Sequence, residues 1–261
     1  MSKEKGHHRP PLGHSSWLSQ LGVYCSRCLG CLFFLAVLRG VPATSRQDLI
    51  RNLDGLSVIG KTLSDPTPKV KEKALNAFNN LSMNIKNQEE IKVYIIQICE
   101  EVDSSSLNSD LQLAGLRLLT NMSVTNNYHH LMTNSIPCFL HLLLEGSERI
   151  QIQVLKVLVN ISANPAMTGH LLSAQAPSLL SLFTSCINRE ILLRMLVFVT
   201  NLIENMKTEE ATATQHQYNK DSFFSVLWGD STQYAQKLAL LLHHHDMEVR
   251  EQVAKIITMI K

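Results

Sequence analysis

Three short motifs in the sequence match the acceptor pattern for N-linked glycosylation, which is asparagine, any residue but proline, then serine or threonine. They begin at Asn80, Asn121 and Asn160. Glycans on these residues would make the chain a secreted glycoprotein. The alternative is that the motif recurs because a structural unit recurs. The spacing and the surroundings of the motifs decide between the two.

Cysteine usage argues against secretion. Disulfide frameworks are typical of small, loop-rich secreted chains, whereas this chain has 261 residues, of which 45% are hydrophobic. Cys99, Cys138 and Cys186 stand singly among apolar residues. We therefore expect free, buried thiols in a reducing compartment.

Three further cysteines, at positions 25, 28 and 31, have the spacing found among iron–sulfur ligands. The bacterial ligand pattern needs a fourth cysteine followed by proline soon after, and none follows here. We predict no cluster, and S-acylation of these thiols is the remaining hypothesis.

The run His243-His244-His245-Asp246 invites a metal interpretation. Successive side chains on a helix point about 100° apart, so three adjacent imidazoles do not converge on one ion. We predict a solvated turn, with Asp246 capping the helix that follows. The chain also lacks a glycine-rich phosphate loop and the HExxH and GxSxG motifs. We therefore predict no enzyme, no metal and no cofactor, and the net charge of +2 does not indicate a nucleic-acid partner.

The first 47 residues differ from the rest of the chain in charge and in pattern. They contain six lysines and arginines and one acidic residue, a net charge of +5, although the whole chain carries only +2. We therefore divide the chain into a basic, partly apolar head, residues 1–47, and a body, residues 48–261. The apolar run at 28–38 is much shorter than the roughly 20 residues of a membrane-spanning helix. Three interpretations remain open for the head: an unstructured segment, a weak membrane anchor or mitochondrial targeting segment, and a signal peptide.

The asparagines of the three motifs mark a repeat. Asn80 and Asn121 are 41 residues apart, Asn121 and Asn160 are 39 apart, and another 41 residues lead to Asn201, which has lost the serine. Apolar residues stand five and two residues before each asparagine and one after it: Leu75, Phe78 and Leu81; Leu116, Leu119 and Met122; Leu155, Leu158 and Ile161; Leu196, Val199 and Leu202. This spacing predicts one buried stripe of an amphipathic helix in each repeat.

Each of these helices is preceded by a residue whose side-chain oxygen can cap the first turn: Thr67, Ser109, Ser147 and Asn188. A short apolar helix is expected before the caps at Thr67, Ser147 and Asn188, because Gly or Pro precedes a short apolar run there: LDGLSVIGKTL, NSIPCFLHLLL and AQAPSLLSLFT. The polar stretch 207–222 has no apolar periodicity and is predicted to be a surface loop. The last stretch, from Ala235 to Lys261, matches the segment around Val70 and predicts a terminal partial repeat.

A long helix that ends in Leu-x-Asn-Leu-Ser, preceded by a short helix and a capped turn, resembles the armadillo repeat. The segments VKEKALNAFNNLSMN, LQLAGLRLLTNMSVTN, QVLKVLVNISANPAMT and HHHDMEV resemble, in this order, the armadillo repeat-containing X-linked (Alex) family and its close autosomal relative. The resemblance covers about residues 48–261. It implies an all-α, right-handed armadillo-type solenoid of about four to five repeats.

The resemblance also implies a function. That family is implicated in mitochondrial distribution and trafficking at the outer membrane, on its cytosolic face, through Miro and TRAK adaptors. Its members begin with an apolar anchor and one further repeat, and residues 1–47 match neither. We therefore expect a non-enzymatic, partner-binding adaptor at mitochondria. The alternative is a soluble protein-interaction scaffold in the cytosol or the nucleus.

The resemblance further implies a binding groove on the concave face of the solenoid, with one asparagine per repeat bonded to an extended peptide: Asn80, Asn121, Asn160 and Asn201. The alternative is that these amides bond the backbone of the neighbouring repeat. One turn earlier, where armadillo importins place tryptophans, the chain has Asn76, Arg117, Lys156 and Val197. Arg117 and Lys156 predict a preference for acidic or neutral segments over basic ones, unless both are plain surface charges. On this basis the three glycosylation motifs are accidental matches within helices.

Overall fold

The computed structural model describes residues 43–175, 179, 182–185, 188–207, 218–229 and 231–260. Within these residues the chain is helical, and the one extended feature is an isolated bridge between Gln175 and Ser222. The α-helices are α3 (Ala43–Asn52), α4 (Gly55–Lys61), α5 (Pro68–Leu81), α6 (Ile85–Ile91), α7 (Ile95–Ser104), α8 (Asp110–Met122), α9 (Ile136–Glu145), α10 (Glu148–Ser162), α11 (Thr168–Ser173), α12 (Leu182–Ser185), α13 (Arg189–Met206), α15 (Ser231–Leu241) and α16 (Met247–Ile260).

Short 3-10 segments link several of these helices: η2 (Thr62–Ser64), η3 (Lys92–Tyr94), η4 (Asn126–Ser135) and η5 (Pro165–Met167), and a π-helical turn, η8, spans Ser225–Gly229. No helix in the described part of the chain is long and apolar enough to cross a membrane. The apolar run 28–38 and the three cysteines of the head lie outside the described residues.

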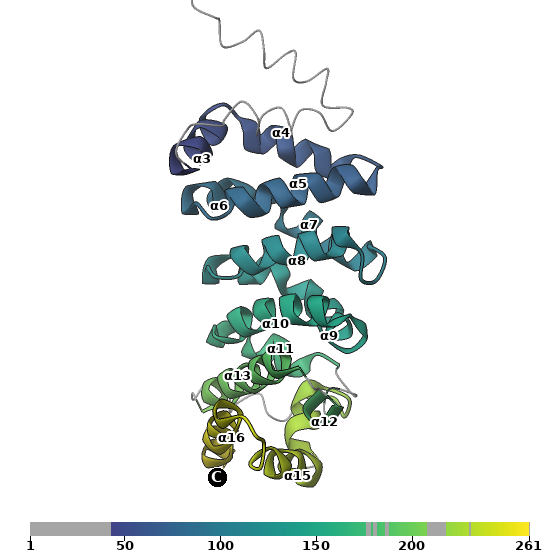
Figure 1. Cartoon of the computed structure of the whole chain (residues 1–261), viewed down its shortest axis with the longest axis vertical. Helices are drawn as coiled ribbons and strands as arrows, with labels where there is room; N and C mark the ends of the chain where they lie inside the picture. The colour runs from purple at the N-terminus through teal and green to yellow at the C-terminus, as the bar shows by residue number, and fades with distance from the viewer. Residues whose placement is uncertain are drawn as a thin grey trace, which may run out of the picture.

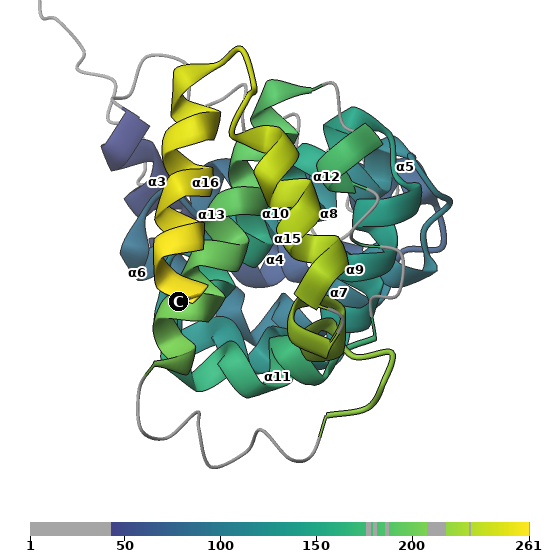
Figure 2. The same cartoon turned by 90° about the horizontal axis from the view of Figure 1, so that it is seen from below.

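The helices form layers stacked along one axis (Figure 1). The long helices α5, α8, α10, α13 and α16 follow one another in this stack, each in contact with the next. The shorter helices α7, α9 and α15 pack beside them, and Figure 2 shows α15 and α16 side by side at one end of the stack. The predicted all-α solenoid is therefore confirmed, and its last layer is the predicted helix pair formed by the stretch from Ala235 onward.

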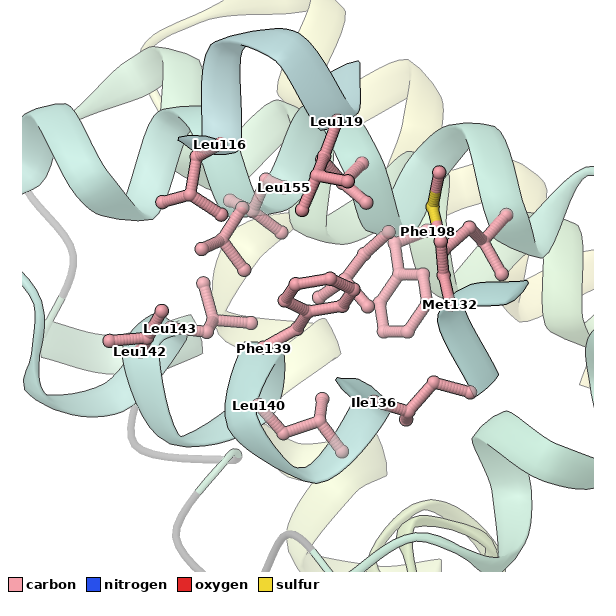
Figure 3. Packing of buried hydrophobic residues seen from close by; sticks show 14 of the residues in the cluster. Leu116, Leu119, Met132, Ile136, Phe139, Leu140, Leu142, Leu143, Leu155 and Phe198 are labelled. Carbon is pink, nitrogen blue, oxygen red and sulfur yellow. The ribbon is translucent and has the colours of Figure 1, made fainter. Parts of the chain in front are cut away.

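The interior is the apolar stripe predicted from the repeat. Every residue of that stripe is buried, with no side chain more than 4% exposed. Figure 3 shows Leu119 of α8, Leu155 of α10 and Phe139 of α9 turned toward a shared interior. Burying one such side chain stabilises the fold by about 1.5–3 kcal/mol. Because each layer buries its stripe against the next, the layers depend on one another for stability.

The predicted helix starts are correct, but only two of the four predicted caps act through their side chains. Ser109 accepts a hydrogen bond from the backbone N–H of Gln112, and Asn188 accepts from Glu190 and Ile191. The predictions for Thr67 and Ser147 are wrong in this respect, because neither side chain makes a capping hydrogen bond.

At those two helix starts, side-chain oxygens of other residues accept hydrogen bonds from the backbone N–H groups of Thr67 and Ser147. Asp65 Oδ1 accepts from the N–H of Thr67 at 2.8 Å, and Asn108 Oδ1 accepts from the N–H of Ser147 at 2.6 Å. Asn108 lies just before α8, one layer earlier in the stack. The acceptor for the N–H of Ser147 is therefore distant in the chain, and the residues around Ser147 did not indicate it.

The predicted burial is confirmed for Cys99 and is only partial for Cys138. Cys99 is buried and Cys138 is half-buried, and both are free. Burial raises the pKa of Cys99 to about 11 and the pKa of Cys138 to about 12. Cys186 lies outside the described residues.

The stretch predicted as a loop, 207–222, begins where α13 ends. Its central part, 208–217, lies outside the described residues. Its far end returns to the stack, where the N–H of Phe223 donates to the carbonyl of Ala174 at 2.7 Å.

Candidate functional site

The seven predicted site residues lie on consecutive long helices, with a pair on each of α5, α8 and α10 and Asn201 on α13, where Val197 completes the fourth pair. In every pair the two residues are four positions apart, so they share one face of their helix. We call the surface that these residues form the ladder face: Asn76, Asn80, Arg117, Asn121, Lys156, Asn160, Val197 and Asn201. The four asparagines at the second position of each pair are its rungs.

Three of the four rungs hold adjacent layers together through their N–H groups. Asn160 Nδ2 donates to Ser123 Oγ at 2.9 Å and to the carbonyl of Thr120 at 3.3 Å. Asn201 Nδ2 donates in the same way to Ser162 Oγ at 3.0 Å and to the carbonyl of Val159 at 3.3 Å. The bond to the neighbouring repeat, which the sequence left open as an alternative, is therefore present.

Asn121 makes the same kind of bond one layer earlier. Its Nδ2 donates to Ser82 Oγ at 3.0 Å and to the carbonyl of Asn79 at 3.1 Å. Asn80 differs, because its side chain makes no hydrogen bond within the described residues; only its backbone carbonyl is used, as the acceptor for Gln47 Nε2 at 2.9 Å.

The rung oxygens remain available. Within the described part of the chain, Oδ1 of Asn121, Asn160 and Asn201 accepts no hydrogen bond, and none of these oxygens is buried without a partner. An amide can donate and accept at the same time, so a rung can tie two layers and still accept an N–H from a ligand. Whether the rungs contact a partner stays a prediction.

The inter-layer bonds explain the serine of the three glycosylation motifs. Ser82, Ser123 and Ser162 are buried, and each hydroxyl donates to the carbonyl three residues earlier, at 2.8, 2.9 and 2.9 Å. Each of the same hydroxyls accepts from the rung of the next layer. The serine is therefore the acceptor half of a bond between layers.

The same bond explains why the fourth motif is incomplete. Ile203 replaces the serine two residues after Asn201. In α13 the rung Asn201 follows the buried residue Ile191 by ten positions. In the next long helix, α16, the residue ten positions after the buried Val249 is Met259, so a methionine takes the place of a rung. Met259 has no amide to donate, so among the described long helices this position needs no hydroxyl acceptor.

A second set of polar contacts between layers was not predicted. In each contact a residue four positions after a rung bonds a residue of the short helical segment one layer earlier: Thr125 to Gln88 at 3.1 Å, Asn164 to His129 at 3.2 Å and Asn205 to Thr168 at 3.1 Å. The recurrence of Thr or Asn four residues after the rungs was the signal that could have revealed it.

His129 is the titratable member of this second set, and the sequence had indicated nothing special about it. Its side chain is buried, and Nε2 lies 2.6 Å from the carbonyl oxygen of Ser123. Because a carbonyl only accepts, Nε2 carries the proton and Nδ1 accepts from Asn164 Nδ2. Burial lowers the pKa of His129. The imidazole is therefore held neutral between two layers.

Arg117 and Lys156 carry unbalanced positive charge on the ladder face. Arg117 is exposed and Lys156 is half-buried, and neither has an acidic partner within the described residues. The acidic residues of α5, α8 and α13 are all engaged in ion pairs: Glu72 with Lys69 at 2.7 Å, Asp110 with Arg149 at 3.0 Å, Glu190 with Arg194 at 2.7 Å, and Glu204 with Lys255 at 2.8 Å. No carboxylate of α5, α8 or α13 is therefore left to neutralise the two cations. On α10, Glu148 lies eight residues before Lys156 and accepts a hydrogen bond from Asn188 Nδ2 at 2.8 Å.

The other two residues at this position bring no charge. Asn76 and Val197 are both half-buried. Next to Val197 the surface has a depression of about 470 Å³, bounded by Val159 of α10, by Leu193 and other residues of α13, and by Glu248 of α16.

The histidine run forms the predicted turn. Residues 242–246 join α15 to α16, and Asp246 Oδ1 accepts from the N–H groups of Glu248 and Val249 at 3.0 and 3.2 Å. The predicted cap is confirmed. Over the described ranges, no group of three or more His, Cys, Asp or Glu side chains could hold a metal ion.

A stack of helical layers with a repeated amide on one face defines the class of the protein, a helical-repeat scaffold suited to binding other proteins. The chain belongs to the Armadillo-like family, whose model matches residues 40–228. The matched region includes α3, which begins at Ala43, before the predicted start of the body at residue 48.

Solved structures agree with this fold. The designed armadillo repeat protein YIII(Dq)4CqI has a TM-score of 0.70 at 14% identity, covering 93% of this chain and 99% of that protein. The designed armadillo repeat protein YIII(Dq.V1)4CPAF in complex with peptide (KR)4 has a TM-score of 0.69 at 15% identity, covering 89% and 92%. A structure of computationally designed armadillo repeat proteins for modular peptide recognition has a TM-score of 0.67 at 16% identity, covering 94% of this chain and 92% of that protein. The predicted armadillo fold is confirmed, and the closer resemblance to the Alex family stays a prediction.

Proposed function

We propose that the chain is a non-enzymatic adaptor whose ladder face binds an extended segment of a partner protein and prefers acidic segments. The observation that carries the proposal is the unbalanced charge of Arg117 and Lys156, one helical turn from rungs whose oxygens accept no internal hydrogen bond. An extended peptide supplies backbone N–H groups to such oxygens. Its carboxylates pair with the two cations.

One solved neighbour supports the mode of binding and sharpens the charge preference. The designed protein YIII(Dq.V1)4CPAF is in complex with a peptide of lysine and arginine. Arg117 and Lys156 would repel such a peptide. We therefore expect this chain to bind an extended segment of the opposite charge.

The test measures fluorescence anisotropy with a labelled glutamate-rich peptide in a glycine–serine background and with its lysine-rich counterpart. Wild-type protein binds the acidic peptide more tightly. The double variant Arg117→Glu/Lys156→Glu weakens that binding about tenfold or more, since two ion pairs with the peptide become repulsions. Neither residue has an ion pair within the described part of the chain, so the urea midpoint should not change.

The matched control is the double variant Lys61→Glu/Lys86→Glu, which makes the same change of net charge at two exposed lysines on α4 and α6. If both double variants weakened binding of the acidic peptide equally, the effect would come from net charge and not from the ladder face. Unchanged binding by the ladder-face variant would place the binding surface elsewhere.

The cellular role is a separate proposal, which rests on the resemblance to the Alex family alone. We propose that the adaptor acts in mitochondrial distribution and trafficking at the cytosolic face of the outer membrane, with Miro- and TRAK-type proteins as partners. The alternative is a cytosolic or nuclear scaffold. Expression with and without residues 1–47, followed by fractionation, separates the two, because recovery of the full chain in the soluble fraction would refute attachment through the head.

A further inference from the structure

We propose that the depression beside Val197 is an anchor pocket for one large apolar side chain of the acidic peptide. This inference rests on the proposed function of the ladder face, which it extends from a charge preference to a sequence pattern. The depression has a volume of about 470 Å³, within the range of about 300–1,000 Å³ that is usual for ligand pockets.

The residues that bound the depression favour an apolar guest. Val159, Leu193 and Val197 are half-buried aliphatic side chains, so each keeps part of its apolar surface exposed to solvent. Covering aliphatic surface of this kind with an apolar side chain is favourable. Val197 occupies the ladder-face position that Arg117 and Lys156 occupy in the preceding layers.

The charged groups at the rim do not call for a charged guest. Arg194 pairs with Glu190 at 2.7 Å, and Arg189 pairs with both Asp246 and Glu248. Every cation that borders the depression is therefore matched by a carboxylate of the protein itself. The rim differs in this respect from Lys156 on the adjacent helix α10, which has no such partner within the described residues.

The stacking of the helices sets the spacing of the ligand pattern. Packed helices lie about 8–10 Å apart, and an extended chain advances about 3.3 Å per residue. Neighbouring layers are thus spanned by two to three residues of peptide. In the ligand that we infer, one acidic residue faces Arg117 and a second acidic residue, two to three positions further along the peptide, faces Lys156. An apolar residue follows after another two to three positions and lies at Val197.

The test uses labelled peptides with two glutamates and one phenylalanine, three positions apart in a glycine–serine background. They are made in both sequence directions, together with versions in which alanine replaces the phenylalanine. For the preferred direction we expect the alanine peptide to bind wild-type protein roughly ten- to hundredfold more weakly, the loss that corresponds to burying one large apolar side chain. Val197→Asn should remove most of this difference, because it replaces an aliphatic wall of the depression with an amide.

Val93→Asn is the matched control, because Val93 is exposed and lies in η3, away from the ladder face. Leu193→Gln serves as a second pocket variant if Val197→Asn alters the circular dichroism spectrum. The pocket would be overturned if the phenylalanine and alanine peptides bound wild-type protein with equal affinity. If Arg117→Glu/Lys156→Glu still weakened the binding of both peptides, the proposed function of the ladder face would stand. Absence of binding by every acidic peptide would overturn both.

Discussion

Replacing Asn160 with alanine tests whether the rungs hold the layers together. The substitution removes two hydrogen bonds, from Nδ2 to Ser123 Oγ at 2.9 Å and to the carbonyl of Thr120 at 3.3 Å. Each such bond contributes about 0.5–1.5 kcal/mol net, so the loss is about 1–3 kcal/mol. The higher helix propensity of alanine offsets up to about 0.7 kcal/mol of this. We therefore expect Asn160→Ala to lower the free energy of unfolding by about 0.5–2 kcal/mol.

The chain contains a matched control for this experiment. Asn80 occupies the same register near the end of α5, but its side chain makes no hydrogen bond within the described residues. Asn80→Ala brings the same gain in helix propensity and loses no bond between layers. The free energy of unfolding of each variant is measured by urea denaturation and compared where the two m-values are equal. The difference between the two free energies isolates the contribution of the hydrogen bonds, about 1–3 kcal/mol.

A double-mutant cycle with Ser123→Ala identifies the partner. If the bond between Asn160 Nδ2 and Ser123 Oγ is formed in solution, the two substitutions should be non-additive by about 0.5–1.5 kcal/mol. Additive effects, or an Asn160→Ala variant as stable as Asn80→Ala, would refute the inter-layer role of the rungs. In that case the asparagines would have to be explained by ligand contact alone.

Three further predictions concern the packing between layers and its titratable groups. Gly115→Ala should cost about 1–3 kcal/mol in urea denaturation, because the new Cβ would lie 2.5 Å from Val102 Cγ2; Gly169→Ala, with no atom within 4 Å of its Cβ, should be neutral or stabilising. The lowered pKa of His129 means that the unfolded chain binds a proton more readily, so stability should be complete above pH 6.5 and fall as the pH drops below the unfolded pKa of about 6.5. His129→Gln, which introduces the residue that the preceding layer uses at this position, should flatten the dependence of the urea midpoint on pH between 7 and 5. Cys99, 3% exposed and with its pKa raised to about 11, should be alkylated at neutral pH only in denaturant, and rapid labelling of the folded chain in a mass-spectrometric time course would contradict the packing of α7.

The fold could be predicted from the sequence because burial follows from register alone. Leu75, Leu116, Leu155 and Leu196 recur at the repeat spacing, and each is buried. A residue on the apolar stripe of an amphipathic helix has one favourable place, the interior. No knowledge of its particular neighbours is needed to predict that place.

The polar positions were less predictable, because an amide or hydroxyl is satisfied by any partner of the right geometry. Ser109 caps its own helix as predicted. Ser147 makes no capping bond through its side chain, and its own N–H donates to Asn108 Oδ1, in the preceding layer. The local sequences of the two serines differ, because Gln112 follows Ser109 by three residues, as in a capping box, whereas Ile150 follows Ser147 by three. The bond from Ser147 to Asn108, 39 residues away in the chain, depends on the position of the adjacent layer.

The sequence by itself determined the period, the helices and their buried stripes, and it placed Asn121, Asn160 and Asn201 at equivalent positions on successive helices. It left open whether these amides face a ligand or the protein. Tertiary structure decided that their N–H groups tie each layer to the one before, with acceptors 37–42 residues away in the chain, and that His129 is buried between two layers. The physical reason is that a hydrogen bond depends on distances of about 3 Å and on direction, and these exist only after the layers have stacked.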